Sequence, residues 1–310
     1  MRNKNYIFGI TLVATLGGLL FGYDTAVISG TVESLRKFFI EPYNLPLDQA
    51  NALEGFVVSS ALIGCILGAS FAGLLSQRYG RKPTLILAAV LFLLSAIGSA
   101  WPELFFGMPG SGDHSFMYNF VAYRILGGVG VGLASMVSPM YIAEVAPADK
   151  RGNLVSWNQF AIIFGQLVVY FVNFLILGSH ANPVIDLVNG VNQIMNPEAA
   201  AWTTETGWRL MFVSEAVPAG LFALLVLLVP ETPRYLAMCG KDERALNVLS
   251  RINGASQAKV ILAEIKATTE EKTERLFTYG WMVIFIGIML SVFQQAVGIN
   301  AVLYFAPRIF

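Results

Sequence analysis

Three residues that can carry a full charge lie deep inside long apolar stretches of the sequence: Asp24, Arg124 and Glu215. An ionised side chain is costly in hydrocarbon, so an ionisable residue inside a membrane span commonly marks a substrate or proton pathway. Two carboxylates around one arginine could keep that arginine buried, and one of them could then be protonated at modest cost. This chemistry suits a proton-coupled switch. A static arginine–carboxylate lock is the alternative, and the residues alone leave open which acid takes the proton.

The composition is that of an integral membrane protein. Hydrophobic residues make up 55% of the chain and charged residues only 13%, whereas soluble domains usually carry about 25% charged residues. The net charge of zero argues against nucleic acid as a partner. Cys65 and Cys239 lie far apart, so we expect free thiols. Neither His114 nor His180 has a second ligand at metal-binding spacing, which predicts no metal site.

The apolar stretches predict an all-α transmembrane protein. A helix needs about 20 mostly apolar residues to cross the hydrocarbon core of a bilayer. Seven stretches meet this requirement, at residues 7–31, 52–75, 84–101, 118–142, 153–177, 208–229 and 278–305. Because successive spans alternate in direction, the three ionisable residues fall at one depth, roughly 10 Å below one surface. We therefore expect them to form a single cluster.

Lysine and arginine residues gather on one side of these spans. Most lie before the first span or in the loops that follow the second, fourth and sixth spans, whereas the opposite loops hold only Arg36 and Lys37, with Arg209 and Arg308 at span edges. This asymmetry predicts a cytoplasmic N-terminus. The polar stretch 231–277 is expected to form cytoplasmic amphipathic helices. Tryptophans near the outer ends of spans are expected to be interfacial anchors, namely Trp101, Trp202 and Trp208.

Uncharged polar side chains line two of the spans. The fifth span carries amides at seven-residue spacing, on one face of a helix: Gln159, Gln166 and Asn173. The seventh span carries Gln294, Gln295, Asn300 and Tyr304. Amides both donate and accept hydrogen bonds, and aromatic rings cover sugar C–H faces, so this set suits a polyhydroxylated ligand. Hydrogen bonds between helices are the alternative use of the same amides.

Six segments together resemble the sugar porters of the major facilitator superfamily, from residue 6 to the end of the chain. They are Phe21-Gly-Tyr-Asp-Thr-Ala-Val-Ile-Ser-Gly30, Gly73-x4-Arg78-Tyr-Gly-Arg-Lys82, Tyr123-Arg-Ile-Leu-Gly-Gly-Val-Gly-Val-Gly132, Glu144-x-Ala-Pro-x3-Arg151-Gly, Pro230-Glu-Thr-Pro-Arg234 and Gln294-Gln-x2-Gly-Ile-Asn300.

The resemblance implies a transporter of two six-helix bundles with a sugar site between them. This chain would supply the N-terminal six-helix bundle (1–230), a cytoplasmic helical linker (231–277) and the seventh transmembrane helix (278–310), which is the first helix of the C-terminal bundle. Five further spans are expected beyond Phe310. The missing C-terminal bundle would supply further sugar ligands and the surface against which the first bundle moves.

The same resemblance implies roles for individual residues. Asp24 would be the proton site, with Arg124 as its partner and Glu215 in the same cluster. The sugar ligands would be Gln166, Gln294, Gln295 and Asn300, with Phe21 and Tyr304 close by. A cytoplasmic ion-pair gate would comprise Arg78, Arg81, Glu144, Arg151, Glu231 and Arg234. For this last group, the alternative is a charge asymmetry that serves topology alone.

The implied function is proton-coupled import of a sugar, with D-xylose as the expected substrate, by alternating access across the cell inner membrane. A facilitative uniporter, a non-transporting sugar sensor and an inactive fragment are the alternatives. The sequence shows no nucleophile–base pair, metal cluster or phosphate loop, so an enzyme is not expected and no cofactor is predicted.

Overall fold

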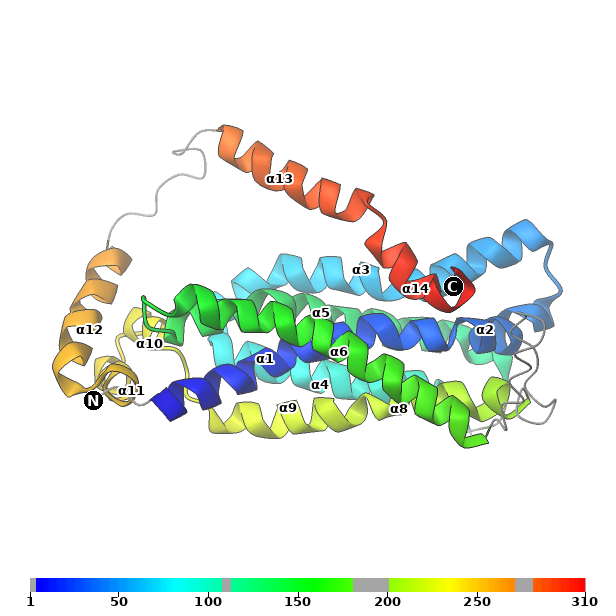
Figure 1. Ribbon diagram of the computed structural model, residues 1–310, viewed down its shortest axis with the longest axis horizontal. Coiled ribbons are helices and arrows are strands. Elements are labelled where there is room, and N and C mark those ends of the chain that lie inside the picture. The colour runs from blue at the N-terminus through cyan, green and yellow to red at the C-terminus, as the bar shows by residue number, and fades with distance from the viewer. Residues whose placement is uncertain (1–3, 108–112, 181–200, 271–280, 310) are drawn as a thin grey trace, which may run out of the picture.

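The computed structural model describes residues 4–107, 113–180, 201–270 and 281–309. Within these residues, all of the long elements are helices (Figure 1). The first five spans are α1 (Lys4–Val27), α3 (Leu47–Tyr79), α4 (Arg81–Ala100), α5 (Met117–Val145) and α6 (Arg151–His180). The sixth consists of η5 (Thr203–Gly207), α8 (Trp208–Ser214) and α9 (Ala216–Leu228).

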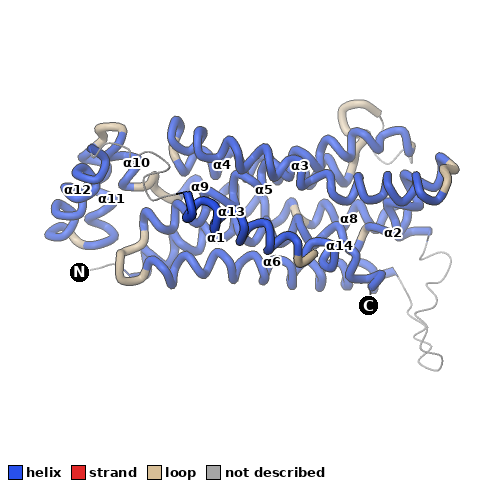
Figure 2. The backbone as a smooth tube through the Cα atoms, turned by 90° about the horizontal axis from the view of Figure 1, so that it is seen from above, coloured by secondary structure: helices blue, strands red, loops and turns tan. Residues whose placement is uncertain are grey.

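Shorter helices lie at the two ends of this bundle. Figures 1 and 2 both show α10 (Pro233–Met238), α11 (Asp242–Asn253) and α12 (Ala255–Glu270) grouped at one end, which we call the α10–α12 end. The opposite end, called the α2 end, carries η1 (Ile28–Gly30), α2 (Val32–Leu35), η2 (Arg36–Ile40), η3 (Glu41–Tyr43) and η4 (His114–Phe116). The stretch predicted to be amphipathic is therefore helical over 233–238, 242–253 and 255–270. The remainder of that prediction, from residue 271 to 277, falls outside the described residues.

The prediction of seven spans is confirmed. Seven described helical segments are long and apolar enough to cross a membrane, and each coincides with one predicted stretch.

Close packing within the bundle depends on glycine. A Cβ atom on Gly64 of α3 would collide with the carbonyl group of Ile125 in α5, and one on Gly128 of α5 would collide with that of Ala61 in α3. The two helices can approach this closely only because neither position has a side chain.

The seventh span contains a break that the sequence did not predict. Two residues, Val297 and Gly298, separate α13 (Trp281–Ala296) from α14 (Ile299–Ile309). Gly298 adopts a left-handed backbone with φ of 78°, a conformation that glycine tolerates without strain. Figure 1 shows α13 angled away from the bundle while α14 lies against it. The main contacts of α14 are with η1 and α1, whereas α13 has no buried residue.

Trp208 differs from its predicted position at the membrane interface. Its side chain is fully buried among Phe38, Phe39, Phe120 and Phe212, with ring centroids 5.3–6.3 Å apart. Burial of a large aromatic surface in this cluster fastens α2-end segments to α5 and α8. The prediction that Trp208 is an interfacial anchor is therefore wrong.

Candidate functional site

The structure brings the three membrane-embedded ionisable residues together. Asp24 of α1 and Arg124 of α5 form an ion pair, with Nη1 and Oδ1 2.5 Å apart and each side chain only 2% exposed. Glu215 lies at the junction of α8 and α9, is also buried, and is close enough to interact electrostatically with both. Phe212, one turn earlier on α8, places its ring centroid 5.4 Å from the guanidinium carbon of Arg124. Three separate spans thus contribute to one charged cluster.

This cluster has unused hydrogen-bonding capacity. Within the described residues, neither carboxylate oxygen of Glu215 has a hydrogen-bond partner, and the same holds for Nε of Arg124. Buried polar groups are nearly always paired, because an unpaired group has lost its hydration without compensation. Beside the cluster, the hydroxyl groups of Tyr23 and Ser214 lie 2.7 Å apart and hydrogen-bond each other. The arrangement can therefore accept a proton or a new partner without first breaking every existing contact.

A cavity of about 940 Å³ opens beside the cluster. Asp24 lines it, and so do all of the residues predicted to contact sugar: Phe21, Gln166, Gln294, Gln295, Asn300 and Tyr304. Gln159 is an additional lining amide. The volume lies within the range of about 300–1,000 Å³ that is usual for small-molecule sites. Helices α1, α3, α5, α6, α13 and α14 contribute to its walls.

Local geometry explains why amides from the seventh span converge on this cavity. The break at Gly298 lets Gln294 and Gln295, at the end of α13, face the same space as Asn300 in α14. The Asn300 side chain donates a 2.8 Å hydrogen bond to Oε1 of Gln295 across the break. The remaining predicted amide differs, because Asn173 donates a 3.4 Å hydrogen bond to the carbonyl of Val27 and serves as a link between helices.

A second cluster at the α10–α12 end joins three of the six predicted gate residues. Arg81 donates to one oxygen of Glu144 through Nη2 at 2.7 Å and through Nε at 3.2 Å. Glu231 accepts hydrogen bonds from the backbone N–H groups of Arg81, Lys82 and Thr232. A carboxylate at the first turn of α4 is favoured by the helix dipole.

Burial of the Glu231 carboxylate opposes the favourable effect of the helix dipole. It raises the pKa of the Glu231 carboxyl group above its ordinary value, while the three backbone donors and the charge of Arg81 oppose that shift. The other predicted gate residues, Arg78, Arg151 and Arg234, are exposed and form no ion pair with either carboxylate in the part of the chain that the structure describes. The structure thus supports a smaller cluster than the sequence predicted.

A buried ion pair at the α2 end was not predicted from the sequence. Arg209 of α8 lies 2.9 Å from Oε1 and 3.2 Å from Oε2 of Glu103, and it also donates to the carbonyl of Ala100 at 2.9 Å. The rings of Phe38 and Trp208 lie 5.3 Å and 4.6 Å from its guanidinium carbon. The position of Glu103 just beyond the third span, at the same end as Arg209, was the available signal.

Comparison with known proteins agrees with this architecture. A family model described as "Sugar (and other) transporter" matches residues 10–310. The D-xylose-proton symporter of Escherichia coli K12 is 53% identical, and the alignment covers 99% of this chain and 61% of the relative. The arabinose-proton symporter of Bacillus subtilis is 38% identical over 100% of this chain and 60% of the relative. The glucose facilitated diffusion protein of Zymomonas mobilis is 35% identical over 99% and 61%.

Solved structures give the same result. The proton:xylose symporter XylE bound to 6-bromo-6-deoxy-D-glucose matches with a TM-score of 0.87 and 53% identity, over 99% of this chain and 63% of that chain. An inward-open XylE from E. coli matches with a TM-score of 0.82, 52% identity and coverage of 98% and 64%. The chain spans about 61% of the length of its curated relatives. It belongs to the sugar transporter family, within the major facilitator superfamily.

Proposed function

We propose that the chain is part of a transporter that imports D-xylose together with protons by alternating access. The observation that carries this proposal is the double role of Asp24, which pairs with Arg124 and also lines the cavity. Protonation of Asp24 would remove its charge and weaken the ion pair. The same event would change the wall of the sugar site, so the two cargoes are coupled through one side chain.

The geometry suggests an order of events. A proton arriving from outside neutralises Asp24, and Arg124 then pairs with Glu215, whose carboxylate oxygens have no other partner among the described residues. Sugar binds among the cavity amides, the Arg81–Glu144 contact at the α10–α12 end breaks, and the site opens inward. Loss of the proton from Asp24 resets the cycle.

The substrate follows from the lining and the relatives. Amides beside Phe21 and Tyr304 suit a monosaccharide, because each amide can both donate to and accept from a hydroxyl group. The 53% identical relative is a D-xylose-proton symporter, which favours a pentose. The facilitated diffusion protein among the relatives supports a second candidate, a uniporter that moves sugar without protons.

A matched pair of variants tests the proton role. In de-energised cells that lack other pentose uptake and express the complete transporter that contains this chain, a xylose pulse should make a weakly buffered medium more alkaline. Asp24→Asn should abolish this proton uptake while sugar counterflow continues. Asp48→Asn, the same change at an exposed site in the first turn of α3, should leave both unchanged. Continued alkalinisation by Asp24→Asn would overturn the proposal, and xylose entry without proton movement by the unsubstituted transporter would establish the uniporter.

We propose further that the protein lies in the cell inner membrane with the α10–α12 end in the cytoplasm, because the basic residues concentrate there. Cys239, at the end of α10, is exposed and provides a probe. In a Cys65→Ala background, a membrane-impermeant maleimide should label Cys239 in inverted vesicles and not in intact cells. Labelling in intact cells would reverse the proposed orientation.

A further inference from the structure

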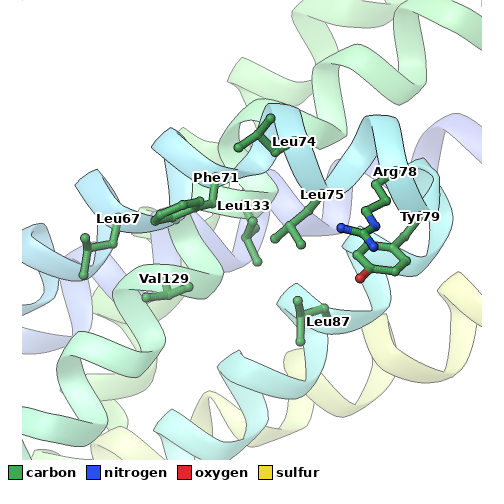
Figure 3. Close-up of a pocket in the computed structure, with 10 residues that line it drawn as sticks. Leu67, Phe71, Leu74, Leu75, Arg78, Tyr79, Leu87, Val129 and Leu133 are labelled. Atoms are coloured by element: carbon green, nitrogen blue, oxygen red, sulfur yellow. The ribbon is translucent and has the colours of Figure 1, made fainter.

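A second hollow lies on the outside of the bundle, between α3, α4 and α5. It has a volume of about 430 Å³ and, apart from Gly68 and two residues at one end, an apolar side-chain lining: Leu67, Phe71, Leu74, Leu75, Leu87, Val129 and Leu133. Figure 3 shows Leu67, Phe71, Leu74 and Leu75 in a row along α3, with Val129, Leu133 and Leu87 across from them, and with Arg78 and Tyr79 at the opposite end from Leu67. Phe71 and Leu74 are more than half exposed, so the groove opens to the surroundings of the protein.

The length of the groove matches one leaflet of a bilayer. It follows α3 from Leu67 to Arg78, which corresponds to about 16 Å along the axis of a helix. The hydrocarbon core of a bilayer is about 30 Å thick, so half of it is about 15 Å. Arg78 belongs to the last turn of α3, which is the depth at which a spanning helix meets lipid headgroups.

Arg78 presents its charge at one end of this groove. Its guanidinium carbon lies 5.6 Å from the centroid of the Tyr79 ring, and no carboxylate in the described part of the chain forms an ion pair with it. Arg81, three residues later, instead points to Glu144. A guanidinium group presents N–H donors in a planar fork that matches phosphate geometry. Tyr79 is also exposed, and its hydroxyl group is a further donor on the adjacent residue.

We propose that this groove binds an anionic phospholipid, with one acyl chain along the apolar row and the headgroup phosphate on Arg78. A lipid fits these observations better than a protein partner does, because the apolar lining extends over about the thickness of one leaflet and then ends at the cation of Arg78. Basic pockets between transmembrane helices are a known form of anionic lipid site. The bound lipid would hold α3 and α4 together where these two helices reach the α10–α12 end of the bundle.

Native mass spectrometry of the purified chain tests this. Phosphatidylglycerol and phosphatidylcholine with identical acyl chains are added separately to the detergent-solubilised protein. One arginine near the headgroups predicts about fivefold greater retention of phosphatidylglycerol. Arg78→Gln should abolish that preference. Lys150→Gln, which removes an exposed cation outside the groove at the same end, should keep it.

A second pair of variants tests the apolar part. Leu87→Trp fills the groove from its exposed side on α4 and should lower retention of both lipids, whereas Leu94→Trp, at a similarly exposed position of α4 outside the groove, should not. Equal retention of the two lipids would overturn the proposal. So would equal effects of Arg78→Gln and Lys150→Gln, or a dimer of the chain that excludes lipid. None of these readings depends on transport.

Discussion

Two buried arginines, Arg209 and Arg124, are held in different ways in this molecule. Arg209 uses Nη1 for Glu103 and the carbonyl of Ala100, and Nε for the carbonyl of Glu205. Aromatic rings lie close to its guanidinium group. Both oxygens of Glu103 are within hydrogen-bond distance of Arg209, and neither is among the unpaired buried atoms of the described residues.

Arg124 has a single described ion-pair contact, with Asp24, while Nε is unpaired among the described residues and a second carboxylate stands nearby. It also adjoins a cavity, through Asp24. The comparison teaches that burial of an arginine does not by itself indicate function. A spare carboxylate and an adjacent cavity distinguish a pair that can exchange partners from one that only fastens helices.

The largest expected effect comes from breaking the ion pair between Arg209 and Glu103. Glu103→Ala should lower the free energy of unfolding by about 3–5 kcal/mol, because it leaves Arg209 buried without its carboxylate. Equilibrium unfolding in detergent micelles measures this. Glu33→Ala, which removes an exposed ion pair with Lys37, is the matched control and should cost less than about 1 kcal/mol. Similar losses for the two variants would remove the basis of the comparison.

Single variants of the Asp24–Arg124–Glu215 cluster should have smaller effects than Glu103→Ala, and these effects should be non-additive. Asp24→Asn and Glu215→Gln should each cost about 1 kcal/mol, because the remaining carboxylate can still pair with Arg124. The double variant should cost about 3–5 kcal/mol, since the arginine is then buried alone. A double-mutant cycle on unfolding free energies tests this. Additive losses would show that the two carboxylates do not substitute for each other.

The smallest effect is expected from the hydrogen bond beside the cluster. Tyr23→Phe should cost about 0.5–1.5 kcal/mol by removing its hydroxyl contact with Ser214. Ser214→Ala should cost a similar amount, and the double variant little more, because both changes remove the same bond. A loss near that of Glu103→Ala would mean that Tyr23 supports the whole cluster.

The spans and the ionisable cluster could be predicted from the sequence because both depend on distance along a helix. Apolar length gives the span, and counting residues from its end gives the depth of Asp24, Arg124 and Glu215. Cavity-lining amides were also predictable, since a seven-residue repeat fixes one helical face. The structure agrees for Gln159 and Gln166.

The direction in which a side chain points from its helix was harder to predict, and so were contacts between segments that are distant in the sequence. Arg78 and Arg81 belong to one motif, yet one lines an outer groove and the other meets Glu144. The position of Trp208 near a span end predicts an interfacial anchor, but segments of the α2 end cover it. Such outcomes depend on tertiary packing, which neither composition nor periodicity contains.

The break at Gly298 divides the cavity-lining side chains of the seventh span between two helices. Gln294 and Gln295 belong to α13, whereas Asn300 and Tyr304 belong to α14, which is docked on α1. A change in the backbone angles of Gly298 would therefore rotate α13, with its two glutamines, while α14 stays in place against α1. A sugar bound by side chains of both helices would fix the angle between α13 and α14. The size of the ligand would therefore determine the orientation of α13.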